Sequence, residues 1–265
     1  MTPPELDMPA LDTARWMAEN GDLDGSARIL AELVADPDAP DRAQAAVGLA
    51  VVLDERGDIE EARSAARTAL ATGHPEFASQ AACHLAGSFE REGSAGQARA
   101  AWQAVIGLGN PAYLPLAHMA LARLAAADGD AGEVERALRE ALATGDPDVV
   151  SRAAQWLAER LLDAGEPGEA ADVLLTALEA PVVAAAERLR VLLGIAHLEL
   201  ACAQFAAAVE EGTDVETSAL AIELLARTLP LRGRDEDAAR VWRYGLEHAD
   251  EDLAGQVRLR MERDL

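Results

Sequence analysis

The side chains that could do chemistry are few in this chain, and they are scattered. No two of its five histidines lie four residues apart, so the HxxxH spacing that places two metal ligands on one helix face is absent. Cys83 and His84 are neighbours, but adjacent residues of a helix point in different directions and seldom bind one ion. These residues therefore predict no metal site.

Two glycine-containing turns are similar to phosphate-binding loops only in composition. Gly129–Gly132 and Gly165–Gly168 follow predicted helices, whereas a phosphate-binding loop follows a strand. The chain also has no GxSxG motif, which would indicate a serine nucleophile. The sequence therefore predicts a protein that is not an enzyme and has no cofactor.

Net charge excludes several classes of partner. The chain has 265 residues, 23 basic and 47 acidic, and a formal net charge of −24. Nucleic acids and anionic membrane surfaces are bound through basic side chains, so we expect no nucleic acid and no membrane as partners. No apolar run in the sequence approaches the roughly 20 residues that span a bilayer.

The N-terminus and the cysteines indicate a compartment. Residues 1–10 have neither the basic segment nor the apolar core of a signal peptide. Cys83 and Cys202 lie far apart, with no CxxC spacing, and we expect both to be small buried apolar residues. A cytoplasmic, reducing setting is the expected localisation.

The elements that must position any site are repeated. Glycine recurs every 36 residues at five positions, namely Gly21, Gly57, Gly93, Gly129 and Gly165. Half of the residues are hydrophobic but only 3% are aromatic, so alanine and leucine dominate and favour helices. We expect each unit to be two helices joined at the glycine. The expected pairs are Glu5–Glu19 with Leu23–Ala35, Asp41–Glu55 with Ile59–Ala71, Pro75–Arg91 with Ala95–Gly107, Pro111–Ala127 with Ala131–Ala143, Pro147–Asp163 with Pro167–Glu179, Pro181–Leu200 with Ala203–Glu211, and Val215–Leu231 with Asp235–His248.

A pattern of small and large residues accompanies the glycines. Leucine then alanine or glycine recurs eight and seven residues before the break, as in Leu49-Ala50 and Leu85-Ala86, and alanine recurs five residues after it. Small residues let helix backbones approach, and large ones at other fixed offsets, such as Trp102 and Leu138, fill the space beside them.

On these residues the chain resembles the bacterial type of tetratricopeptide repeat, with about seven repeats of 36 residues. The resemblance implies an all-α fold, an α-solenoid in which antiparallel helix pairs stack into a right-handed superhelix. It predicts one domain over residues 1–265, with repeats near 7–40, 41–74, 75–110, 111–146, 147–180, 181–214 and 215–249. The last helix, 251–264, is expected to cap the core, and docking or self-association is a second interpretation.

The sixth repeat departs from the pattern. Ala201 replaces the turn glycine, and Glu210 and Asp214 stand where apolar residues are expected. We expect this repeat to be a kink or a docking notch.

The resemblance also implies a concave groove, lined by the first helix of each pair, that binds a protein or peptide partner. Four arginines on this lining predict an acidic partner segment, or else they pair with nearby acids. The candidate groove residues are Gln44, Gln80, His84, Met119, Arg123, Arg152, Gln155, Trp156, Glu159, Arg188 and Arg227.

The function expected on this basis is that of a non-catalytic adaptor or scaffold. Two alternatives remain open: a regulatory sensor that responds to a peptide or effector, and an accessory subunit of an enzyme complex. The acidic N-terminal end also allows for self-association, head to tail.

Overall fold

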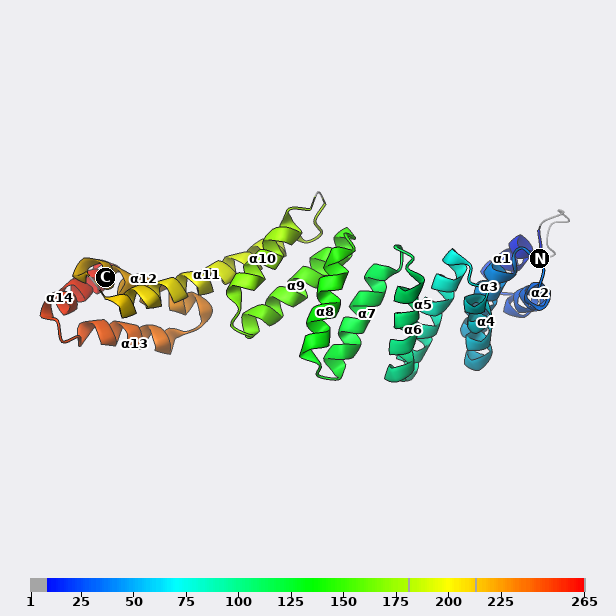
Figure 1. Cartoon of the computed structure of the whole chain (residues 1–265), viewed down its shortest axis with the longest axis horizontal. Helices are drawn as coiled ribbons and strands as arrows, with labels where there is room; N and C mark the ends of the chain where they lie inside the picture. The colour runs from blue at the N-terminus through cyan, green and yellow to red at the C-terminus, as the bar shows by residue number, and fades with distance from the viewer. Residues whose placement is uncertain (1–8, 181, 213, 265) are drawn as a thin grey trace. The chain divides into compact units, whose positions relative to one another are not determined.

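Helices fill the chain, as its alanine and leucine content favours. The structure is a computed structural model that describes residues 9–180, 182–212 and 214–264. Within these ranges it is all-α, with fourteen α-helices and two short 3₁₀ helices (Figure 1). The chain divides into two units, unit 1 (residues 1–153) and unit 2 (residues 154–265).

Unit 1 contains eight complete helices and the start of a ninth. They are α1 (Ala10–Glu19), α2 (Leu23–Ala35), α3 (Arg42–Arg56), α4 (Ile59–Ala71), α5 (Pro75–Glu92), α6 (Ala95–Leu108), α7 (Leu114–Ala127), α8 (Ala131–Ala143) and α9 (Pro147–Asp163), which ends in unit 2. Unit 2 continues with α10 (Pro167–Leu178), α11 (Ala186–Glu211), α12 (Val215–Thr228), η1 (Leu229–Arg232), α13 (Asp235–Leu246), α14 (Glu251–Met261) and η2 (Glu262–Asp264).

Sequential antiparallel pairing organises these helices. In unit 1, α3 packs on α4, α5 on α6 and α7 on α8, and each pair packs on the next through α4 with α5 and α6 with α7. The predicted all-α solenoid of antiparallel helix pairs is therefore confirmed. In Figure 1 the successive pairs of unit 1 lie side by side.

The glycines that separate the paired helices have the backbone that only glycine adopts easily. Gly57, Gly93 and Gly129 have φ angles of +89°, +80° and +76°, and an L side chain would be strained there. Each glycine ends the first helix of a pair and lets the second begin within two residues.

The small residues beside the glycines are buried. Ala50, Ala86 and Ala122 in the first helices are almost inaccessible to solvent, and so are Ala62 and Ala98 in the second helices. The larger Trp102, Leu138 and Leu174 are buried next to them. The predicted alternation of small and large side chains therefore forms the core.

Several helix ends differ from the prediction. Residues 5–8 of the expected first helix lie outside the described residues. Helix α7 begins at Leu114 rather than Pro111, because the Asn110 side-chain oxygen accepts a hydrogen bond from the Ala112 amide and holds a turn there.

The sixth pair was predicted wrongly. Instead of two helices that break near Ala201, one helix of 26 residues, α11, runs through that position. Alanine, unlike glycine, is the strongest helix former, and the segment Leu200–Ala203 contains nothing that ends a helix. The two halves of α11 therefore extend in one direction rather than folding back on each other.

Helix α14 covers the end of unit 2. It packs on α12 and α13, and its Leu253 and Val257 are buried in one cluster with Ala219 and Ile222 of α12. This is the arrangement expected of a capping helix.

Candidate functional site

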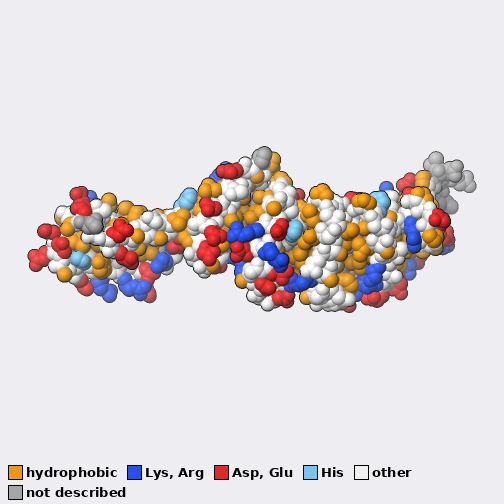
Figure 2. Space-filling model, viewed as in Figure 1, with side chains coloured by type: hydrophobic (Ala, Val, Ile, Leu, Met, Phe, Trp, Pro, Cys, Tyr) orange, Lys and Arg blue, Asp and Glu red, His pale blue; other side chains and the backbone are white. Residues whose placement is uncertain are grey.

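An apolar strip crosses the first helices of three successive pairs in unit 1. Val47, Cys83 and Met119 lie 36 residues apart on α3, α5 and α7, and Val51 and Gly87 are likewise 36 residues apart. Leu116 lies one turn before Met119 on α7, and Arg123 occupies the α7 position equivalent to Gly87. Val51 and Leu116 are 42% and 47% exposed, while the other members are half-buried. We name this surface the unit 1 strip, and its residues are Val47, Val51, Cys83, Gly87, Leu116 and Met119. Hydrophobic side chains are visible over unit 1 in Figure 2.

Ion pairs join the helices that carry the strip. The Arg91 guanidinium of α5 lies 2.6 Å from the Asp54 carboxylate of α3, and Arg123 of α7 lies 3.1 Å from Glu90 of α5. Glu90 also accepts a hydrogen bond of 2.5 Å from the Trp102 indole of α6. The three helices are therefore connected by polar contacts.

A second polar cluster lies at the other end of these helices. The Glu76 carboxylate accepts hydrogen bonds from the Tyr113 hydroxyl at 2.8 Å, Asn110 at 3.0 Å and Gln80 at 2.8 Å. These donors favour the ionised form and hold the pKa of Glu76 below its usual value, with Tyr113 contributing most. The cluster fixes the start of α7 against α5.

Cys83 and His84 are kept uncharged by burial. Burial raises the pKa of the Cys83 thiol to about 11, so the nucleophilic thiolate is scarce at neutral pH. Burial also lowers the pKa of His84, and among the described atoms its buried Nε2 has no hydrogen-bond partner. Both residues therefore contribute to the surface as largely apolar groups.

The structure separates the candidate groove residues of unit 1 into two groups. Gln44, Gln80, His84 and Met119 are half-buried on α3, α5 and α7, alongside the strip. Arg123 is exposed but already paired with Glu90. Arg152 on α9 is exposed, and its Nε donates to the Asp148 carbonyl oxygen at 3.3 Å.

In unit 2 three candidate groove residues come together. Gln155 donates to Glu159 at 2.9 Å, and Arg188 lies 3.6 Å from the same carboxylate. Trp156 is half-buried beside them in α9.

The Arg227 side chain already has interaction partners within unit 2. Its guanidinium lies 3.2 Å from Glu223, donates to the Arg260 carbonyl oxygen of α14 at 3.1 Å, and stands over the Trp242 ring. Arg123, Arg188 and Arg227 thus each have a carboxylate partner within the chain, as expected if these arginines pair with nearby acids. The role of all the candidate residues in partner binding stays a prediction.

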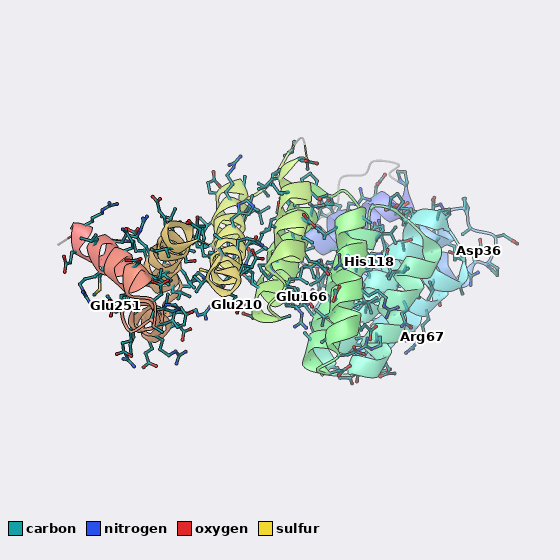
Figure 3. The ribbon with its side chains drawn as sticks, turned by 60° about the vertical axis from the view of Figure 1, so that its left-hand side comes forward. Asp36, Arg67, His118, Glu166, Glu210 and Glu251 are labelled. Atoms are coloured by element: carbon teal, nitrogen blue, oxygen red, sulfur yellow. The ribbon has the colours of Figure 1, made fainter. Side chains whose placement is uncertain are left out.

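A cleft in unit 2 lies along α11. It has a volume of about 780 Å³, and we name it the α11 cleft. Its floor is apolar, with Cys202, Ala203 and Ala206 of α11 and Leu225 of α12. The turn between α9 and α10 contributes Gly165 and Pro167. In Figure 3 the label on Glu166 marks this turn and the label on Glu210 marks the far end of α11.

Charged side chains form the rim of the α11 cleft. Glu199 and Glu210 come from α11, and Arg234, Asp237 and Arg240 come from the segment that includes α13. Asp237 is paired with both arginines, and the hydrogen bond from Arg234 is the main reason why its pKa is lowered. An apolar floor inside a charged rim is the usual composition of a surface that binds a protein segment.

Sequence reasoning missed the residues of this cleft, although one signal pointed to it. Arg234, Asp237, Arg240 and Tyr244 were not among the candidates because no motif singles them out. Ala201 in place of glycine was the available signal, and it had suggested a kink or a notch. The structure has an uninterrupted helix with a cleft beside it.

Metal-binding and membrane-spanning features bear on two of the sequence predictions. Among the described residues, no group of three or more His, Cys, Asp and Glu side chains is placed to hold a metal ion. One described helix, α11, is long and apolar enough to cross a membrane by length and composition, with a mean hydropathy of 1.6 in an 18-residue window. The expectation that no apolar run approaches this length was therefore wrong.

Comparisons with known proteins yield structures alone. No protein-family model matches the chain, and no curated protein matches its sequence. Solved structures similar to this one include MamA, with a TM-score of 0.48 and 18% identity over 66% of this chain and 96% of that chain. A tetratricopeptide repeat protein from Parabacteroides merdae has a TM-score of 0.47 and 15% identity, over 95% and 97% of the two chains. The apo form of the quorum sensor NprR from B. thuringiensis has a TM-score of 0.46 and 12% identity, over 88% and 73%.

Proposed function

We propose that the protein is a non-catalytic interaction scaffold that binds a segment of a partner protein on the unit 1 strip. The observation that carries this proposal is the exposure of Val51 and Leu116 on first helices that are joined by ion pairs. A rigid surface loses little conformational entropy when a partner binds, so apolar contacts on it convert efficiently into affinity.

The chemistry of the strip favours an apolar segment. Its members are apolar or lack a side chain, and Gly87 leaves room, since a methyl group there would meet only the Arg91 guanidinium, at 3.7 Å. Partner side chains could therefore approach the α5 backbone at Gly87. Burying apolar area at such a surface contributes about 25 cal/mol per Å² before the losses of association are subtracted.

A more specific version of this proposal is that the partner segment is acidic. It rests on Arg123 and Arg152, but Arg123 would have to leave Glu90 before it could bind a partner's carboxylate. Exchanging one exposed ion pair for another changes the free energy little, so we place the affinity in the apolar strip. The proposal also includes that the protein acts in the cytoplasm.

The proposal is tested by capture of partners from a lysate of the native cell. Wild-type protein is compared with Val51→Asp/Leu116→Asp, and the retained proteins are quantified by mass spectrometry. We expect the variant to retain its partners at least about tenfold less, because two carboxylates would be desolvated in the interface.

A matched variant separates this effect from added charge. Ile59→Asp/Leu108→Asp adds the same two carboxylates at exposed apolar positions of unit 1 on α4 and α6. The control should retain the partners of the wild type. Equal losses in both variants, or no loss in either, would place partner binding on another surface.

A separate measurement tests whether the partner segment is acidic. Arg123→Glu/Arg152→Glu should reduce capture, and raised salt should weaken the wild-type interaction, only if the partner segment is acidic.

A further inference from the structure

Helix α11 replaces the expected sixth helix pair. Part of its surface therefore lacks the neighbouring helix that covers the equivalent surface in the other pairs. In the other pairs, a glycine such as Gly93 or Gly129 lets the second helix fold back on the first. Helix α11 packs on both α10 and α12, and Cys202 and Val209 of its second half cluster with residues of α12. Because α11 is continuous, its two halves cannot cover each other. Only 11% of the apolar 18-residue window in α11 is buried.

One face of α11 forms a stripe on which Arg188, Ala203 and Glu210 are exposed and the other members are half-buried, while the exposed Val191 lies outside it. The residues that lie three or four positions apart before and after Glu199 share one face of the helix. Glu199 and the residues after it line the α11 cleft, and the residues before it continue the same face beyond it. The α11 stripe consists of Glu199 and of Arg188, Leu192, Ile195, Ala203, Ala206 and Glu210.

This stripe is complementary to itself in the antiparallel direction. Its residues lie at equal sequence distances on either side of Glu199, so an antiparallel copy centred there places Ile195 opposite Ala203 and Leu192 opposite Ala206. Large side chains then face small ones, as close helix packing requires. At the ends of the stripe, Arg188 faces Glu210, so that a cation meets a carboxylate.

We propose that the occupant of the α11 cleft is α11 of a second copy of this chain, with the two helices crossing antiparallel at Glu199. The contact is isologous: each copy inserts the first half of its α11 into the cleft beside the second half of the other, and a closed dimer results. The inference goes beyond the proposed function, because it concerns unit 2 alone.

The size of the cleft fits this occupant. Two turns of an α-helix with its side chains, about 10 Å across, occupy roughly 850 Å³. The α11 cleft has a volume of about 780 Å³, and a helix end carrying leucine and isoleucine on one face matches its apolar floor.

Charges at the crossing point are compatible with a two-fold axis. Two Glu199 carboxylates would approach each other there, but each already lies 2.8 Å from Arg232 of its own chain. The axis therefore brings together two neutral pairs rather than two bare carboxylates. Arg188 is also free to turn toward Glu210 of the second copy, because its present pair with Glu159 is long, at 3.6 Å, and largely exposed.

A bilayer is a less suitable cover for α11. The Glu199–Arg232 pair lies in the middle of the apolar window, where a membrane-spanning helix would place it in hydrocarbon. Packing on α10 and α12 also ties α11 to the rest of unit 2. Binding to lipid is therefore an outcome that the test has to distinguish.

The test uses the full-length protein in analytical ultracentrifugation, over roughly 1 to 100 µM. We expect a reversible monomer–dimer equilibrium. Ala203→Arg places a long cation in the small half of the stripe and should weaken the dimer at least about tenfold. Ala203 is exposed, so the fold should tolerate the change, and circular dichroism verifies this. Gln204→Arg is the matched control, since this exposed residue lies about 140° around the helix from Glu199 and should leave dimerisation unchanged.

Charge exchange identifies the antiparallel register. Arg188→Glu alone and Glu210→Arg alone each place like charges opposite one another and should weaken the dimer. The double variant Arg188→Glu/Glu210→Arg restores opposite charges and should restore the wild-type affinity.

Three results would overturn the inference. The first is a wild-type protein that stays monomeric over the whole concentration range. The second is a dimer that responds neither to Ala203→Arg nor to the charge exchange, which would place the interface elsewhere. The third is a monomer that floats with phosphatidylcholine vesicles and loses this binding with Ala203→Arg, which would make lipid the occupant.

Discussion

Aspartate in place of Val257 is expected to detach α14 and to lower the free energy of unfolding of unit 2 by about 4 kcal/mol. Val257 is fully buried against Ala219 and Ile222 of α12, so an aspartate there would place a carboxylate among apolar side chains. Exposure of the α12 core should follow, because α14 supplies the outer cover of that cluster. Urea unfolding followed by circular dichroism measures the change.

The neighbouring residue provides the control for this substitution. Gln256 is exposed on the same helix, and Gln256→Asp changes the net charge by the same amount. Its free energy of unfolding should stay within about 0.5 kcal/mol of the wild type. If Val257→Asp were equally mild, α14 would not be the cap of unit 2.

Alanine in place of Arg63 is expected to lower the free energy of unfolding of unit 1 by about 3 kcal/mol. Arg63 of α4 is only 3% exposed. Its guanidinium donates to Glu92 of α5 at 2.9 Å and to the Ser88 hydroxyl at 2.9 Å, and it stands over the Phe89 ring. Removing it leaves the Ser88 hydroxyl without this donor and leaves a cavity between two successive pairs.

The control for Arg63 lies one helical turn further along. Arg67 is exposed on α4, and Arg67→Ala removes the same charge without removing a buried contact. We expect a change of less than about 0.5 kcal/mol. If the two variants proved equally stable, the Arg63 contacts would not hold α4 against α5.

Most of the fold could be predicted from the sequence, because one local rule recurs. Each glycine at the 36-residue spacing permits the left-handed backbone that ends a helix, and the alanines at fixed offsets permit close packing. Residue types at positions such as Gly93 and Ala86 therefore determine both helix ends and contacts. The prediction failed at α11 because the turn residue is missing there, and we had expected a distorted pair rather than an uninterrupted helix.

The candidate surfaces were harder to predict, since they depend on which side chains find partners. Arg123 and Arg227 could be placed on first helices from their spacing, but their pairing with Glu90 and Glu223 depends on neighbouring helices. The same applies to the α11 cleft, whose rim brings together Glu199 and Arg240 from segments far apart in sequence. Residue spacing within a single helix contains no information about such contacts.

Both the α11 cleft and the proposed dimer depend on α11 being one continuous helix. The most direct test is the distance between spin labels at Arg190→Cys and Glu211→Cys, in a Cys83→Ser/Cys202→Ser background and with excess unlabelled protein. Both sites are exposed, and the excess of unlabelled chains isolates distances within one chain. A continuous helix predicts roughly 32 Å between the two backbone positions, because each residue rises 1.5 Å. A distance of roughly 10 Å, that of two packed helices, would mean that the chain folds back near Ala201 and that α11 is not one helix.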